Sequence, residues 1–318
     1  MLNSAALAAV EHVLDDTGDV ERDRSGNPTG RLWRYDDRLR PALPETDPRP
    51  GLALVVDELF RLGITSVTDA TPDLDPTAVA LLKSLPLPVT LLGDPDGTAP
   101  RKLLLRDHDL PTYPALRKTV ARTHETGRPV AVHCVTRESL LLTLAVLDDV
   151  GHLPGDRIEH AAVVPDPSAL RGLRVVTQPG FIADRGDDYL RDVRTDDQQD
   201  LYRYESLCAA GVEVLPSSDA PYGPLDPWAV MRTARERRTA AGVLLGPEER
   251  VSPARVLDGY LCDSDGRRRA VAVGSPARLT LLSGPLVEAL SDPCREAVVM
   301  TSTPDLLEHG VHHLRDGE

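Results

Sequence analysis

The sequence predicts an α/β fold, a (β/α)8 barrel of the TIM type, and three observations point to it. Seven short apolar runs alternate with amphipathic helical patterns between residues 51 and 265. The runs are rich in Val, Ala and Ile without strict apolar–polar alternation, which is typical of parallel strands buried on both faces. Two consecutive runs each end on a histidine, His133 and His160, at the strand edge where α/β proteins build active sites.

The pattern divides the chain into three segments. Residues 1–50 are an irregular N-terminal segment, because a short helical pattern is followed by a polar, turn-rich stretch without a core face. Residues 51–265 form the barrel, and residues 266–318 form a small β accessory subdomain of two or three antiparallel strands. The strands expected in the barrel are 64–70, 88–94, 102–109, 129–135, 157–164, 174–182 and 212–223.

The helices between these strands follow from the same periodicity. Gly63 and Gly127 each end a helical pattern directly before a strand. Residues 138–150, between the two histidine strands, repeat with the 3.6-residue period of a helix. The leucines expected on its buried side are Leu140, Leu141, Leu144 and Leu147.

Composition excludes several classes of function. The net charge is −14 and no Lys/Arg-rich run occurs, so we expect no nucleic-acid partner and no anionic membrane surface. No apolar run approaches the roughly 20 residues of a membrane span, and the N-terminus lacks the basic start of a signal peptide. The four cysteines are scattered and suit a reducing compartment. These features predict a cytoplasmic protein with a small-molecule partner.

Lysine usage identifies one residue. The chain has 33 arginines but only three lysines, Lys83, Lys102 and Lys118. Such an arginine bias replaces lysine wherever a positive charge alone is needed. Lys83 and Lys118 lie in helix-like, solvated contexts, whereas Lys102 opens an apolar run. Lys102 is therefore expected to have a chemical role.

Four residues fall on candidate strand ends at intervals of one or two β/α units: Lys102, His133, His160 and Asp219. Such spacing directs all four side chains to one rim of a barrel. Two imidazoles and a carboxylate suit Zn²⁺, and a carboxylate beside metal-activated water is a natural general base. Each residue also has an ordinary interpretation. A single histidine at a strand end is more often a polar core group, and Asp219 by itself is more typical of an Asx turn or helix cap.

Residues near these positions are candidates for substrate binding. Arg137 lies just past His133 and could pair with a substrate carboxylate, or with a surface carboxylate of the protein itself. Gln178 and Arg185 follow the strand near residue 174. Tyr222, three residues after Asp219, could donate a hydrogen bond to an oxyanion or pack.

The motifs, taken in order, resemble the amidohydrolase superfamily, and most closely its branch of N-substituted formamide deformylases. They are GITSVTDA, RKLLLRDHD, VAVHCV, DRIEHA, VTQPGF, SSDAPYGPLDPW and VGSPARLTLL. The resemblance implies a (β/α)8 barrel with one or two divalent metals, usually Zn²⁺. It implies that His133 and His160 are the fifth- and sixth-strand metal ligands. Asp219 matches the eighth-strand aspartate, and Lys102 the bridging lysine, which is commonly carboxylated.

One family motif, the first-strand His-x-His, is absent. The chain begins with a segment that resembles the part of the family downstream of that strand. We therefore expect an incomplete barrel without its first strand, and one Zn²⁺, or at most two, with Lys102, His133, His160 and Asp219 as the candidate metal ligands. The unpaired strand edges predict self-association into a homo-oligomer.

Three functions stay open. The first is a metal-dependent hydrolase of C–N bonds in amides or formamides, with Asp219 as the base. The second is a shortened, catalytically inactive binding protein or subunit, which the absence of His-x-His favours. The third is a lyase that uses Lys102 as a Schiff base, which leaves the two histidines unexplained.

Overall fold

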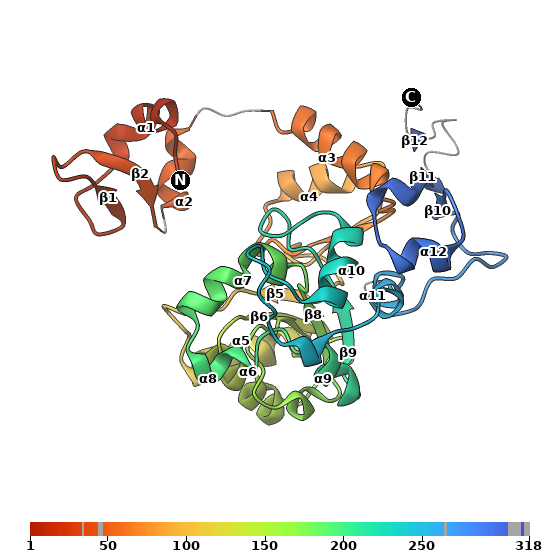
Figure 1. Cartoon of the computed structure of the whole chain (residues 1–318). Helices are drawn as coiled ribbons and strands as arrows, with labels where there is room; N and C mark the ends of the chain where they lie inside the picture. The colour runs from red at the N-terminus through yellow and green to blue at the C-terminus, as the bar shows by residue number, and fades with distance from the viewer. Residues whose placement is uncertain (34, 44–46, 264–265, 305–312, 315–318) are drawn as a thin grey trace. The chain divides into compact units, whose positions relative to one another are not determined.

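The structure is a computed structural model and describes residues 1–33, 35–43, 47–263, 266–304 and 313–314 (Figure 1). The chain divides into two compact units, Met1–Leu54 and Val55–Glu318. The first unit has more regular structure than the irregular segment that the sequence predicts. Its elements are α1 (Ser4–Val10), η1 (Glu11–Val13), β1 (Val20–Arg22), β2 (Pro28–Leu32), α2 (Asp36–Leu39) and η2 (Arg40–Ala42).

A hairpin accounts for this difference. Strands β1 and β2 pair antiparallel. In the turn between them, the Asp23 carboxylate accepts hydrogen bonds from the backbone N–H groups of Ser25 and Asn27, at 2.8 and 2.9 Å. Gly26 adopts a φ of 85°, which a glycine adopts without strain. The polar residues of this stretch therefore build a turn, whereas the sequence pattern predicts an irregular chain.

The second unit contains seven parallel strands, at all seven positions that the sequence predicts. Strands β3 (Val67–Asp69) and β4 (Val89–Leu91) form one pair. A five-stranded sheet has the order β5-β6-β7-β8-β9, the order of the chain. Its strands are β5 (Arg101–Leu103), β6 (Val130–Cys134), β7 (Arg157–His160), β8 (Arg174–Thr177) and β9 (Glu213–Pro216).

The two sheets meet but do not close into a complete barrel. The Lys102 N–H donates to the Leu92 carbonyl at 3.1 Å, so the chain just after β4 lies beside β5. Among the described residues no strand joins β9 to β3. The α/β class is therefore confirmed, whereas a closed eight-stranded barrel is not.

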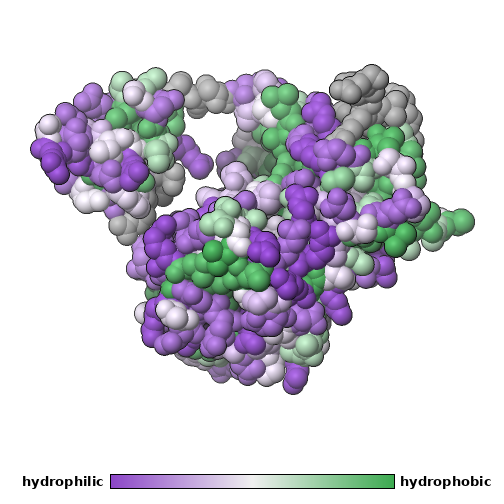
Figure 2. Space-filling model, in the orientation of Figure 1, coloured by the Kyte–Doolittle hydropathy of each residue, from purple (hydrophilic) through white to green (hydrophobic). Residues whose placement is uncertain are grey.

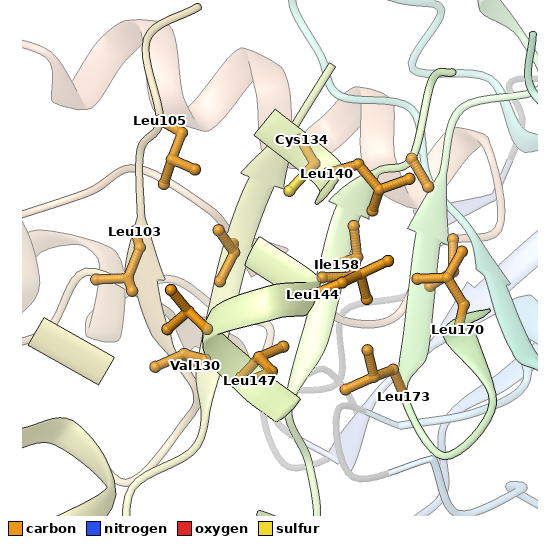
Figure 3. Close-up of a cluster of buried hydrophobic side chains, with 14 of the residues drawn as sticks. Leu103, Leu105, Val130, Cys134, Leu140, Leu144, Leu147, Ile158, Leu170 and Leu173 are labelled. Atoms are coloured by element: carbon orange, nitrogen blue, oxygen red, sulfur yellow. The ribbon is translucent and has the colours of Figure 1, made fainter. Parts of the chain in front are cut away.

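Helices cover one face of the five-stranded sheet. Those of the barrel unit and the helix that leads into it are α3 (Arg49–Arg61), α4 (Pro76–Lys83), α5 (Tyr113–Glu125), α6 (Arg137–Val150), η3 (Pro167–Leu170), α7 (Phe181–Asp192), α8 (Thr195–Gln198), α9 (Tyr204–Ala209), α10 (Pro227–Glu236), η4 (Pro247–Glu249) and α11 (Pro253–Tyr260). Val130 and Ile158 from the strands pack with Leu140 and Leu147 of α6 in one buried cluster (Figure 3). Successive strand residues point to opposite faces, so this apolar packing leaves the other face for polar side chains.

Helix α11 lies against β9, the last strand of the sheet. A Cβ atom at Gly259 would lie 2.4 Å from Cδ of Pro216, so only glycine allows this close approach. The helix thus packs onto the strand that leads into the loop carrying Asp219.

The C-terminal strands form the expected small antiparallel sheet, with β10 (Leu279–Leu282), β11 (Val298–Ser302) and β12 (His313–Leu314). Helix α12 (Leu286–Ser291) and η5 (Arg295–Ala297) connect the first two. The Thr280 hydroxyl donates to the Gly63 carbonyl at 2.9 Å, and the Thr301 hydroxyl to the Phe60 carbonyl at 2.6 Å. These bonds fasten the sheet to the end of α3. Residues 305–312 and 315–318 of the predicted subdomain lie outside the described residues.

No helix in the described ranges is both long and apolar enough to cross a bilayer.

Candidate active site

The register of the central strands assembles a polar face. His133 of β6 pairs with Glu159 of β7, and Lys102 of β5 pairs with Ala131, two residues before His133. Paired residues on neighbouring strands point to the same face, as do residues two apart on one strand. Lys102, His133 and Glu159 therefore share the face that the helices leave uncovered.

Lys102 lies in the middle of β5, whereas the sequence predicts it at a strand end. The strand begins one residue earlier than predicted, at Arg101, and ends at Leu103, and all three of its residues pair with β6. Lys102 is 7% exposed. Its backbone lies beside Ala131, two residues before His133, and its four-carbon side chain can carry the amine toward the histidines. Lys83 pairs with Asp94 at 2.7 Å, but no ion pair in the described part of the chain involves Lys102.

The two histidine rings are in edge-to-face contact. Their centroids lie 4.5 Å apart, with 74° between the ring planes. His160 ends β7 with a left-handed backbone, φ 68°, and Ala161 continues it with φ 47°. Such conformations are costly for residues other than glycine, and they cluster at functional sites.

Gln178 fixes the orientation of the His160 ring. Nδ1 of His160 lies 2.8 Å from Oε1 of Gln178. The amide nitrogen of Gln178 donates to the Ser217 hydroxyl at 2.9 Å, which assigns the oxygen to the histidine side. Nδ1 therefore carries the hydrogen, and Nε2 keeps its lone pair for another partner.

Both rings are neutral at pH 7. Burial lowers the pKa of His133, and the positive charge of Lys102 lowers it further. Burial lowers the pKa of His160 to about 4, with contributions from His133 and Lys102. Neutral imidazoles with free lone pairs are the form in which histidine binds metals.

Asp219 lies in the loop that follows β9. The Ser217 N–H donates to the Thr177 carbonyl of β8 at 2.8 Å, which holds the start of this loop beside the strand next to His160. Asp219 has a φ of 51°, and its carbonyl accepts from the N–H of Tyr222 at 2.8 Å. Burial raises the pKa of its carboxyl group, and the charge of Lys102 partly offsets this. In the described part of the chain no hydrogen-bond donor contacts this carboxylate, so it can accept a proton.

Glu159 belongs to the same face and was missed by the sequence reasoning. It is 4% exposed and accepts a hydrogen bond from Nε of Arg157 at 2.6 Å. Burial alone would raise the pKa of Glu159, but the charges of Arg157 and Lys102 lower it overall, so it is a carboxylate. The signal was present in DRIEH, where the charged Arg157 and Glu159 flank Ile158 within a predicted strand.

The four candidate substrate-binding residues differ in their surroundings. Gln178 is 1% exposed and lies behind His160. Arg137 pairs with Asp197 and, at 3.3 Å, with Asp200. Arg185 donates to the Tyr222 carbonyl at 3.2 and 2.9 Å, and the Tyr222 side chain is exposed. Arg185 of α7 is therefore bonded to the Asp219 loop, on which Tyr222 lies. Contact of any of the four with a substrate stays a prediction.

The histidine pair can hold a metal ion only if Lys102 supplies a further ligand. Among the described residues no three His, Cys, Asp or Glu side chains gather closely enough to hold a metal ion. His133 and His160 supply two nitrogen donors. A protonated lysine is no ligand, but a carboxylated Lys102 would add oxygen donors, and nitrogen with oxygen ligands suits Zn²⁺.

Residues 1–260 match the family model described as "Amidohydrolase family". The chain belongs to the amidohydrolase family. The resemblance seen in the sequence motifs is thereby confirmed. This amidohydrolase is 29% identical over 161 residues to an N-substituted formamide deformylase of Arthrobacter pascens, which covers 47% of the chain and 30% of that protein.

Solved structures share the fold. An uncharacterized metal-dependent hydrolase from Pyrococcus furiosus has a TM-score of 0.63 at 20% identity, covering 81% of the amidohydrolase chain and 63% of the other. One from Pyrococcus horikoshii has a TM-score of 0.61 at 21% identity, covering 81% and 62%. The chain thus spans about a third of the curated relative and less than two thirds of these two structures.

Proposed function

We propose that this amidohydrolase is a metal-dependent hydrolase that cleaves the C–N bond of a small amide or formamide-like molecule. One observation carries the proposal: two neutral imidazoles are in edge contact at the carboxyl edge of a parallel sheet. Lys102 is close enough to lower the pKa values of His133 and Asp219. The formamide class is taken from the relative of Arthrobacter pascens, and the metal from the family resemblance.

In this proposal His133, His160 and a carboxylated Lys102 hold one Zn²⁺. The ion supplies a Lewis acid that polarises a carbonyl group and lowers the pKa of water. Gln178 keeps His160 in the tautomer whose Nε2 is free. Glu159 and Arg157 form a buried ion pair on the same face, beside these ligands.

Asp219 is the proposed base. As water adds to the carbonyl carbon, the Asp219 carboxylate takes a proton from that water. It then gives the proton to the nitrogen as the C–N bond breaks, so that a carboxylic acid and an amine are formed. A raised pKa suits this role, because a base with a pKa closer to neutrality can both take up and return the proton.

The second candidate function is an inactive binding protein of the same family. The specific observation in its favour is that no cluster of three ordinary metal ligands occurs among the described residues. A lyase with Lys102 as a Schiff base needs no metal, but it gives the oriented, neutral histidine pair no role.

Metal content of protein purified without chelator tests the first part of the proposal. We expect about one Zn²⁺ per chain by elemental analysis, as for a single site of two histidines and an oxygen donor. His133→Ala and His160→Ala should abolish binding, and Lys102→Arg should weaken it, because arginine cannot be carboxylated. His108→Ala, at an exposed histidine, is the control. Two full equivalents, or none, would contradict a single site.

Asp219→Asn tests the base. The substitution keeps the shape but removes the basicity, so kcat should fall by about 10²- to 10⁴-fold with metal content unchanged. Release of formate or carboxylate from a panel of N-substituted formamides and N-acyl amines gives the rate. Asp96→Asn, at an exposed loop position, is the matched control and should keep wild-type activity. If the wild type hydrolyses none of the panel, the result supports the alternative of an inactive binding protein. If it does and Asp219→Asn is equally fast, another group is the base.

A further inference from the structure

Three aromatic side chains form a wall beside the histidine pair. They are Phe181 and Tyr189 of α7 and Tyr202, which precedes α9, and we call them the aromatic wall. The Phe181 and Tyr202 rings meet edge to face at 6.0 Å, and the Tyr189 and Tyr202 rings lie 5.7 Å apart. Neither tyrosine takes part in the binding of the metal or in the proton transfer proposed above.

The backbone fixes this wall next to His160. The Tyr202 N–H donates to the carbonyl of Ala162 at 2.9 Å, two residues after His160. Leu201 and Val163 form a bridge in the same place. Ala162 and Val163 belong to the same buried cluster as Tyr202, with Val135, two residues after His133, packed against it. The wall therefore packs on the segments that leave the two histidine strands.

The opposite side of the wall touches the Asp219 loop. A Cβ atom at Gly223 would lie 2.6 Å from Cε1 of Phe181, so the turn after Asp219 rests on that ring. Arg185, one helical turn before Tyr189 on α7, donates to the Tyr222 carbonyl and lies over the Phe181 ring at 5.0 Å. The wall thus connects the His160 segment with the Asp219 loop.

The two phenols have one hydrogen-bond donor to spare. Their oxygens lie 3.2 Å apart, and only one hydrogen can lie between them. In the part of the chain that the structure describes, neither oxygen has another hydrogen-bond partner, although Tyr202 is 3% exposed. The charge of Asp219 also acts on both phenols, whose pKa values are raised chiefly by burial. Tyr189 is half-buried, so a donor of this pair is left for a molecule that reaches its open side.

A buried arginine holds Tyr202 in this position. Arg237 is 1% exposed, and its guanidinium group donates to the carbonyls of Tyr202 at 2.9 Å, Leu201 at 3.1 Å and Leu245 at 2.9 Å. Tyr202 has a φ of 48°, a left-handed conformation that this bonding maintains. Such an arrangement keeps a strained residue in one orientation.

We infer that the Tyr189–Tyr202 pair donates a hydrogen bond to the carbonyl oxygen of the substrate, a planar amide or formamide. The inference rests on the proposed function and names a group that contacts that substrate. A carbonyl oxygen has two lone pairs, so it can accept from a phenol while the other lone pair meets the metal. The bond strengthens as the oxygen gains negative charge when water adds to the carbon, so it favours the transition state.

Phenylalanine substitutions remove the donors and keep the rings. Either single variant, Tyr189→Phe or Tyr202→Phe, leaves one phenol that can still donate, so a moderate loss is expected. The double variant leaves none, and its kcat on the formamide cleaved by the wild type should fall by about 10²-fold or more, as for a lost oxyanion donor. Tyr204→Phe is the matched control, because Tyr204 is a buried tyrosine whose hydroxyl has no hydrogen-bond partner among the described residues and which belongs to a different core cluster. Wild-type kcat and KM in the double variant would overturn the inference.

A binding measurement separates this inference from the proposed function. The full chain is labelled with 3-fluorotyrosine in an Asp219→Asn background, and its seven tyrosine ¹⁹F resonances are assigned with single Phe variants. Addition of formanilide, an N-substituted formamide, should shift the Tyr189 and Tyr202 signals and leave that of Tyr204 in place. A shift in the labelled variant, together with a wild-type chain that hydrolyses none of the panel, would keep the contact and refute the hydrolase. The absence of a shift in the Tyr189 and Tyr202 signals would overturn the inference, even if hydrolysis is found.

Discussion

His133 and His160 show how strand register and a few local bonds prepare two side chains for chemistry. They come from neighbouring strands, and the left-handed backbone at His160 turns its ring against that of His133. Burial and the nearby Lys102 keep both rings uncharged, and Gln178 selects the tautomer of one. Together these effects leave a ring nitrogen with a lone pair that no donor of the protein uses. A metal ligand needs such a lone pair.

In metal-free protein this pair should make stability depend on pH. The folded-state pKa of His160 is about 4 and that of His133 is lowered, compared with 6.5 for an ordinary histidine. The unfolded chain therefore binds more protons between these values. The free energy of unfolding should rise with pH across that range, by up to about 1.4 kcal/mol per pH unit for each histidine.

Urea unfolding of chelator-treated protein at several pH values measures this slope. His160→Gln should reduce the slope between pH 4 and 6.5, whereas His108→Gln, at an exposed residue, should leave it unchanged. An equal slope in wild type and His160→Gln would show that folding does not lower the pKa of His160.

At the scale of elements, helix α11 supports the strand that carries the proposed base. It packs on β9, and the chain from β9 runs through Ser217 to Asp219. Gly259 makes the contact possible, because any side chain at this position would overlap the ring of Pro216. The position of Asp219 is therefore tied to the fit between a helix and a strand about 40 residues apart in the sequence.

Gly259→Val should disrupt this fit. The added side chain has no space, so we expect a loss of about 1–3 kcal/mol in the free energy of unfolding, as for overpacking of a core. Activity on a cleaved formamide should fall more than metal binding does, because Asp219 shifts while the two histidines do not. Gly284→Val, where the nearest atom to a Cβ is the flexible end of Glu288 at 3.6 Å, is the control for both denaturation and rate. Equal stability of the two variants would refute the role of the α11–β9 contact.

At the scale of the molecule, the strands of the barrel unit leave two outer edges. Among the described strands β3 pairs only with β4, and β9 pairs only with β8. Helix α11 packs on β9, and the accessory sheet bonds to the end of α3 just before β3. Apolar side chains remain exposed elsewhere, among them Val271, Val273 and Val287 (Figure 2 shows hydrophobic patches on a largely hydrophilic face).

These features support the prediction of a homo-oligomer. An edge strand and exposed valines are both favourable contacts for a second copy of the chain. Sedimentation velocity should show a mass above that of one chain that increases with concentration. Val273→Asp should shift the distribution toward the monomer if the segment with Val271 and Val273 lies in the contact between copies. Thr29→Asp, at an exposed residue of β2, is the control. A single species with the monomer mass at every concentration would contradict the prediction.

The sequence by itself determined the α/β class, the positions of seven strands and the family. It did so because these depend on local patterns: apolar runs, helical periods and the ends marked by glycines. Even so, the strands are shorter than predicted, and one leucine of α6 was assigned to the wrong side. Leu140, Leu144 and Leu147 are buried, but Leu141 is 54% exposed. A helical period gives a stripe of residues and does not fix the width of the buried part.

Only the tertiary structure decided how the site is built. The middle position of Lys102 in β5, Gln178 behind His160, the buried Glu159 and the spare donor of the Tyr189–Tyr202 pair all depend on contacts between residues that the chain brings together from different elements. Left-handed backbone at His160, Tyr202 and Asp219 is likewise not specified by the local sequence. Isolated residues avoid that conformation, so it persists only where packing and long-range hydrogen bonds hold it.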